Sequence, residues 1–240
     1  MIIAGLLAGR WIPRQTERII QRCVDDPLIK AVFVLTPKDM FPGTCKDLLA
    51  DKKVWHINSW VGQDSHNKTG INRERLRSMI RHHMDFDPVR WENVKYIWLG
   101  DDDAMPAPDY FEKLAEIEYE YPVLLTGKTF NLDGIRWYDW CTFGADHQPF
   151  CIPYETWDDP RWGRDIYCSG NQHVMNRSAF NLNVPYPDHQ GEDPWYCRAF
   201  TKAGGRLMFR PELSMTLVKW HPPASHGLRD ADGIVRFPPK

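Results

Sequence analysis

The chain lacks the features that would place it in a membrane or export it. Its 240 residues contain no apolar run of about 18 residues, so we expect no membrane-spanning helix. Residues 1–8 are apolar but too short for the core of a signal peptide, and Arg10 follows them. These absences favour a soluble intracellular protein, and we expect a cytoplasmic location.

An excess of charge and a metal-binding cysteine pattern are also missing. The 30 Lys and Arg residues nearly balance the 32 Asp and Glu residues, and the formal net charge is −2. This net charge gives no reason to expect bulk electrostatic binding to nucleic acid or to an anionic membrane, but it does not exclude a local basic groove. None of the six cysteines forms a C-x-x-C motif, so a zinc ribbon or thioredoxin motif is unsupported.

What is present is an alternation of strand and helix patterns. Hydrophobic residues make up 42% of the chain and charged residues 26%, as in a folded soluble protein with one sizeable core. Apolar runs predict strands at 2–7, 31–35, 54–57, 96–99 and 123–126, and helical spacing predicts helices at 13–23, 45–50, 73–84, 109–119 and 194–203. The alternation predicts an α/β fold with a mostly parallel sheet flanked by helices. Between 127 and 167 the pattern dissolves, which is typical of a functional loop or lid.

Three consecutive carboxylates follow the fourth predicted strand. The strand stops at Gly100 and is followed by Asp101, Asp102 and Asp103. Ligands of α/β sheets bind beyond the carboxyl ends of the strands, where these residues would lie. Adjacent carboxylates repel one another, and Mg²⁺ or Mn²⁺, which prefer oxygen ligands, would relieve that repulsion. The alternative is a solvated acidic turn before the helix that starts near Pro108.

A second acidic pair, Glu192 and Asp193, precedes the last predicted helix. A carboxylate here could accept a proton from a substrate hydroxyl. Acidic residues also favour helix N-termini for purely structural reasons. From the residues alone, both interpretations stay open.

The order of these signals resembles a known family. A strand ending in an Asp cluster, an aromatic loop and Gly191-Glu192-Asp193 opening a helix together resemble the GT-A glycosyltransferases, in particular the inverting family 2 type. The resemblance spans roughly residues 2–225. It implies a single GT-A-like (Rossmann-related) domain, with a nucleotide-sugar-binding part at about 1–105, an acceptor-binding and catalytic part at about 106–226, and a loose tail at 227–240.

The resemblance assigns roles to the acidic residues. Asp101 and Asp103 match the DXD motif that holds a Mn²⁺ or Mg²⁺ ion, with Asp102 on the donor side between them. Asp193 matches the base that activates the acceptor, with Glu192 beside it. The implied reaction transfers a sugar from a nucleotide-diphosphate-sugar donor to an acceptor hydroxyl with inversion, while the metal stabilises the leaving diphosphate.

Further positions match the family's donor site. Arg75, in the segment after Asn67-Lys68-Thr69-Gly70, fits an arginine that pairs with base or phosphate oxygens, and Lys68 could reach a phosphate. Leu76 stands where the family has Asn. Arg77 and Arg81 are expected to belong to a solvated helix face. The family's second strand usually ends in acidic residues that read the nucleotide base, and in the segment 36–39 only Asp39 is acidic. His221 fits a third metal ligand, with His226 as a competitor.

The acceptor side rests on fewer residues. Gly170 would allow close backbone approach to a sugar, and Trp137 and Trp140 could form a platform. The donor is expected to be of UDP or GDP type. The acceptor hydroxyl could belong to a glycan, a protein, a lipid-linked intermediate or a modified nucleobase.

Two alternative functions would use some of the same residues. A sugar-nucleotide nucleotidyltransferase also uses metal and carboxylates on an α/β sheet, but Gly5-Leu-Leu-Ala-Gly9 is a poor version of its phosphate loop. A non-catalytic carbohydrate-binding protein would use the Asp cluster for Ca²⁺ and the tryptophans for glycan, which leaves Glu192 and Asp193 unexplained.

Overall fold

The central sheet has seven strands within the part of the chain that the structure describes. This computed structural model describes residues 1–9, 15–37, 46–58, 69–130, 140–143, 149–152, 167–168, 172–188, 192–217, 228–229 and 235–236. The order of the strands across the sheet is β12-β6-β11-β4-β1-β2-β3. Their bounds are β1 (Ile2–Leu7), β2 (Ile29–Leu35), β3 (Val54–Ile57), β4 (Tyr96–Asp101), β6 (Val123–Thr126), β11 (Gln172–Asn176) and β12 (Arg206–Phe209).

The sheet is mostly parallel, as predicted. Strand β1 pairs in parallel with β2 and β4, β2 with β3, and β6 with β12. Strand β11 runs antiparallel to both of its neighbours, β4 and β6. The predicted α/β fold class with a mostly parallel central sheet is therefore confirmed.

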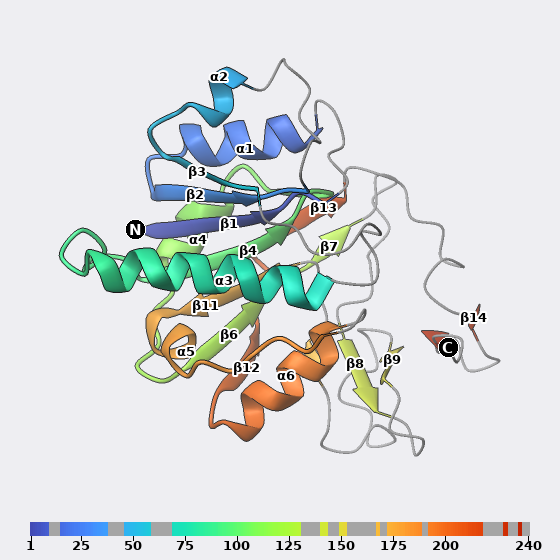
Figure 1. Cartoon of the computed structure of the whole chain (residues 1–240). Coiled ribbons are helices and arrows are strands. Elements are labelled where there is room, and N and C mark those ends of the chain that lie inside the picture. Colours follow the sequence, from blue (N-terminus) through green and yellow to red (C-terminus); the bar gives the residue numbers. More distant parts are fainter. Residues whose placement is uncertain are drawn as a thin grey trace.

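Helices cover both faces of this sheet (Figure 1). Their bounds are α1 (Gln15–Asp25), α2 (Lys46–Leu49), α3 (Thr69–Phe86), α4 (Tyr110–Glu116), α5 (Arg177–Asn181) and α6 (Glu192–Lys202). Side chains of α1 and α4 pack on one face, where Ile20 and Phe111 join Trp98 of β4. Side chains of α3, α5 and α6 pack on the other face, where Ile80 and Phe200 join a second core.

The two cores follow from the strand alternation. Strand β1 is buried along its whole length, and successive side chains point to opposite faces. Ile2, Ala4 and Leu6 therefore enter the core under α1 and α4, and Ile3 and Leu7 enter the core under α3. A strand that is apolar at every position is typical of a sheet covered on both faces.

Two smaller sheets lie beyond the carboxyl edge of the central one. The first has the order β5 (Ala104–Pro106), β13 (Met215–Leu217), β7 (Thr129–Phe130). The second has the order β10 (Tyr167–Cys168), β8 (Trp140–Phe143), β9 (Pro149–Ile152), β15 (Val235–Arg236), β14 (Leu228–Arg229). Within residues 127–167, predicted as irregular, β7, β8 and β9 with the start of β10 are the regular pieces that the structure describes. No helix among the described residues is long and apolar enough to cross a membrane.

Candidate functional site

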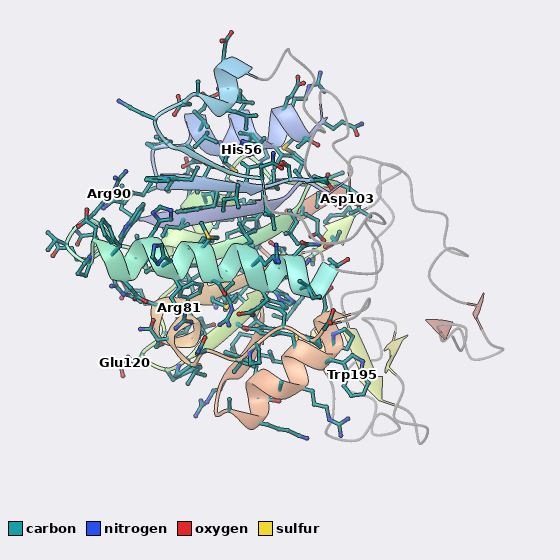
Figure 2. The ribbon with its side chains drawn as sticks, viewed as in Figure 1. His56, Arg81, Arg90, Asp103, Glu120 and Trp195 are labelled. Carbon is teal, nitrogen blue, oxygen red and sulfur yellow. The ribbon has the colours of Figure 1, made fainter. Side chains whose placement is uncertain are left out.

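The acidic cluster lies at the carboxyl edge of the sheet, as predicted. Strand β4 ends at Asp101, which is in register with Leu7 at the end of β1. The backbone N–H of Asp102 donates to the Leu7 carbonyl oxygen at 3.1 Å, which fixes the start of the turn. Asp102 is buried, and Asp101 and Asp103 are half-buried. Figure 2 shows Asp103 at this edge, on the side of the two smaller sheets.

A buried arginine joins the two predicted carboxylate groups. Arg73 of α3 donates from Nη2 to Asp101 Oδ1 at 2.8 Å and from Nη1 to Asp193 Oδ1 at 2.5 Å. The Arg73 side chain is 1% exposed, and the two carboxylates are 24% and 23% exposed. The guanidinium also lies 5.7 Å from the centre of the Tyr186 ring. One side chain therefore holds the end of β4 and the start of α6 together.

The carboxylates at this edge affect one another. Burial raises the pKa of Asp101 to about 6, while the Arg73 guanidinium lowers it and the nearby Asp103 and Asp193 carboxylates raise it. The effect of Asp103 and Asp193 follows from like charges at short range. A bound cation would oppose that repulsion, because it favours the ionised form of each carboxylate.

A buried histidine lies beside Asp193, and a buried tyrosine contacts that histidine. His173 of β11 has Nε2 3.2 Å from Asp193 Oδ1 and Nδ1 2.7 Å from the Tyr186 hydroxyl. Burial lowers the pKa of His173 well below its ordinary value, and Arg73 lowers it further, so the imidazole is neutral. Tyr186 stacks on Tyr196 of α6 with ring centres 3.9 Å apart. Asp193 therefore lies against a rigid aromatic layer.

Glu192 and Asp193 begin helix α6, as the sequence predicts. Only the backbone of Glu192 is described, so its predicted role as partner of the base stays a prediction. For Asp193 the Arg73 bond shows that the carboxylate contacts the sheet edge. Stabilisation of the helix N-terminus by its negative charge acts in addition.

Sequence reasoning missed Arg73 and chose Arg75 as the arginine of the site. Arg73 precedes Leu76 and Ile80 by three and seven positions, so the helical period places all three on the buried face. Arg75 is exposed on α3, and its predicted donor contact stays a prediction. The helical period could have identified Arg73, but as a charged residue it was expected to lie off the face of Leu76 and Ile80.

The expectation that Arg77 belongs to a solvated helix face is wrong. Its side chain is 2% exposed and donates to Glu74 Oε1 at 2.6 Å and to Asn183 Oδ1 at 3.2 Å. Arg81, assigned to the same face, is half-buried and donates to the Phe180 carbonyl oxygen. Aliphatic stems of these arginines can cover apolar surface while the guanidinium groups find partners.

Several predicted site residues lie outside the described residues. For Trp140 only the backbone, in β8, is described. The residues outside are Asp39, Lys68, Trp137, Gly170, His221 and its competitor His226. Their roles stay predictions.

The carboxylates suit a cation that is also bound by substrate phosphates better than a cation bound by protein ligands alone. Among the residues that the structure describes, no group of three or more His, Cys, Asp or Glu side chains could hold a metal ion. Asp101 and Asp103 supply two neighbouring carboxylates. Magnesium is often held by one or two carboxylates together with substrate phosphates, and this pair suits that mode.

No protein-family model matches the chain, and no curated protein sequence matches it. Solved structures do. The 4-diphosphocytidyl-2C-methyl-D-erythritol synthase of Anaerococcus prevotii is 11% identical, with a TM-score of 0.48 over 87% of this chain and 86% of that one. The inositol-1-phosphate CTP transferase of T. maritima is 8% identical, with a TM-score of 0.49 over 90% of this chain and 88% of that one.

These matches correct the predicted activity. One structure is named as a diphosphocytidyl-methylerythritol synthase and the other as a CTP transferase, and neither is named as a glycosyltransferase. Both names contradict the expected glycosyltransferase of the inverting family 2 type. The alternative weighed beside it, a nucleotidyltransferase, agrees better with both names. At these identities the likeness concerns the fold, so the argument for a function has to come from the site.

Proposed function

We propose that the protein is a nucleotidyltransferase that uses a divalent cation to join a nucleoside triphosphate to a phosphorylated sugar or related small molecule. One observation carries this proposal: the buried Arg73 holds Asp101 and Asp193 together at the carboxyl edge of the sheet. This arrangement orients the Asp101 carboxylate at the end of β4, where α/β folds bind phosphates, and Asp103 follows two residues later.

The proposed reaction needs no base at Asp193. An oxygen of the acceptor phosphate attacks the α-phosphorus of the triphosphate, and the bond to the β-phosphate oxygen breaks to release pyrophosphate. The acceptor phosphate carries no proton that must be removed at neutral pH. Asp193 already accepts a hydrogen bond from Arg73 at 2.5 Å, which suits a positioning role better than proton abstraction. Transfer to a neutral hydroxyl would need such a base.

Asp101 and Asp103 are the proposed ligands of the cation, Mg²⁺ or Mn²⁺. The ion, when bound, offsets the negative charge of the triphosphate and of the leaving pyrophosphate. A metal ligand must be deprotonated, and the pKa of about 6 leaves Asp101 mostly ionised at neutral pH. Arg73 donates to one oxygen of Asp101, so the carboxylate is already oriented before a cation binds. Arg75 and Lys68 are the proposed contacts to the triphosphate.

The direct test is the release of pyrophosphate. The protein is incubated with each of the four common ribonucleoside triphosphates, Mg²⁺ and a set of sugar phosphates, and pyrophosphate is measured. We expect release with one nucleotide and one acceptor, and a loss of at least about 100-fold in the Asp101→Asn and Asp103→Asn variants.

Asp109→Asn is the matched control. Asp109 lies in the same part of the chain, its side chain is 48% exposed, and it pairs with Lys113 at 2.6 Å. This variant should keep full activity. Equal activity of the Asp103→Asn variant would contradict the proposed site, and release of nucleoside diphosphate from nucleotide-sugars without pyrophosphate would contradict the reaction.

A further inference from the structure

A separate pocket lies at the far end of helix α3 from Arg73. Its volume is about 330 Å³. Its lining includes Trp55, His82, His83, Phe86, Arg90 and Trp91. Thirteen residues separate Arg73 from Phe86, which corresponds to about 20 Å along the helix. Figure 2 shows Arg90 and Asp103 at opposite ends of the central sheet.

The walls of this pocket are aromatic rings held by the core. Trp55 stacks on Phe33 with an angle of 12° between the rings, and its ring centre is 4.3 Å from that of His83. Trp91 is 1% exposed and tilts against Phe33. Because Phe33 is fully buried in β2, both indoles are anchored, and the half-buried Trp55 presents a preformed ring surface.

Two exposed apolar side chains lie at this end of α3: Phe86 lines the pocket, and Val89 follows three residues later in the chain. Phe86 is 82% exposed and Val89 is 75% exposed. Apart from Met1, they are the only large hydrophobic side chains classed as exposed among the described residues. Exposed apolar surface gathered at one place on a soluble domain marks a binding site more often than isolated exposure does.

The charges around the pocket are mainly positive. The Arg90 guanidinium lies 4.9 Å from the centre of the Trp91 ring and 5.5 Å from that of Trp55. Lys30 Nζ lies 5.7 Å from the Trp91 ring and donates to the Arg90 carbonyl oxygen. The one acidic lining residue, Asp87, accepts a hydrogen bond from the Arg90 backbone N–H at 3.1 Å. The Trp55 Nε1–H has no hydrogen-bond partner in the described part of the chain.

We propose that this pocket binds a planar aromatic ring that carries an anionic group. The ring would stack among Trp55, His83 and Phe86, and the anion would lie beside Arg90 and Lys30. The volume is at the small end of ligand pockets, which suits a ligand with a single ring system. This site is independent of the proposed nucleotidyl transfer.

Two kinds of molecule share this chemistry, and titration calorimetry separates them. The probes are adenosine 5′-monophosphate and indole-3-carboxylate, with neutral adenosine and inorganic phosphate as comparisons. EDTA is present throughout, which keeps metal-dependent nucleotide binding at the sheet edge out of the measurement. We expect at least one of the two anionic probes to bind at least about tenfold more tightly than adenosine or phosphate.

Arg90→Ala tests the location. Arg90 is exposed, so the fold should persist, and we expect the affinity to fall at least about tenfold. Arg206→Ala is the matched control, because its guanidinium lies 4.3 Å from the Tyr121 ring at another place on the surface. Asp101→Asn should leave binding unchanged. Failure of both anionic probes to bind, or equal binding by Arg90→Ala, would overturn the proposal.

Discussion

Arg73 is a charged side chain on the apolar face of a helix, and its partners explain why it is tolerated there. A buried guanidinium needs partners that compensate for its lost hydration, and Asp101 and Asp193 both supply a carboxylate oxygen. The sequence identified both carboxylates from their positions after a strand and before a helix. It could not identify the arginine by composition, because the rule that charged residues face water points the other way. Only the partners, which lie 28 and 120 positions away, reverse that rule.

Replacing Arg73 should therefore destabilise the fold. In the Arg73→Met variant the two carboxylates lose their shared partner and face each other across the edge. We expect the free energy of unfolding to fall by about 3 kcal/mol, the lower end for a broken buried pair, because both carboxylates keep some access to water. Urea unfolding at neutral pH measures this. The Arg75→Met control, on the exposed side of the same helix, should stay within about 0.5 kcal/mol of the parent.

The raised pKa of Asp101 predicts the pH dependence of stability. In the unfolded chain this group titrates near its ordinary value of 3.8, and in the folded protein near 6, because burial disfavours the charged form. Between these values the native state binds more protons, so the free energy of unfolding falls as the pH rises from about 4 to about 6 and is then constant. The contribution is on the order of 2–3 kcal/mol. The measured quantity is the difference in unfolding free energy between the parent and Asp101→Asn across this range, and a difference that rises with pH would contradict the assignment.

At the scale of whole elements, β11 is the main feature that the sequence did not predict. Strands β1, β3 and β6 match the predicted ranges, because apolar runs in a sheet covered on both faces are easy to recognise. In β11, by contrast, Gln172, His173 and Asn176 are buried polar residues among only two apolar ones. Their partners come from distant elements: Gln172 accepts from the Tyr110 hydroxyl, and His173 contacts Tyr186. A strand whose polar groups are satisfied by tertiary contacts has no period-2 apolar signature.

Asn176 shows what such a residue contributes. Its Oδ1 accepts from the Val123 N–H of β6 and from the Ala179 N–H of α5, both at 3.0 Å, and its Nδ2 donates to the Tyr121 carbonyl oxygen at 2.8 Å. It therefore caps α5 and also fixes the entry of β6. Asn176→Ala removes the cap and leaves the buried Val123 N–H without this partner, so we expect a loss of about 2–3 kcal/mol.

Thermal or urea unfolding of Asn176→Ala measures that loss. The matched control is Asn181→Ala, an exposed asparagine at the other end of the same short helix, which should cost less than about 0.5 kcal/mol. Similar losses of unfolding free energy in the two variants would contradict the prediction, because the hydrogen bond from Val123 of β6 to Asn176 would then contribute nothing measurable.

Across the whole molecule, the order of strand, acidic cluster and late acidic helix correctly predicted the fold class and the edge of the sheet where the carboxylates lie. It did not separate glycosyl transfer from nucleotidyl transfer, because either reaction would use carboxylates and a cation at the ends of the strands. What separates them physically is whether the acceptor needs a base. That depends on the surroundings of Asp193, namely Arg73 and His173, which come from α3 and β11 and which no local pattern around Asp193 reveals.

The whole-molecule prediction is that stability depends on nucleotide and metal together. A ligand that binds only the native state raises the unfolding free energy by mass action, by about 2.7 kcal/mol at 100 times its dissociation constant. For a chain of 240 residues each kcal/mol corresponds to about 2–4 °C in Tm, so a saturating nucleoside triphosphate with Mg²⁺ should raise Tm by about 5–10 °C. Differential scanning fluorimetry measures the shift. It should vanish with EDTA and in Asp103→Asn, because the cation links the phosphates to the carboxylates, and it should persist in Asp109→Asn. A full shift in the presence of EDTA would mean that the nucleotide binds without the cation, and the proposed roles of Asp101 and Asp103 would then be wrong.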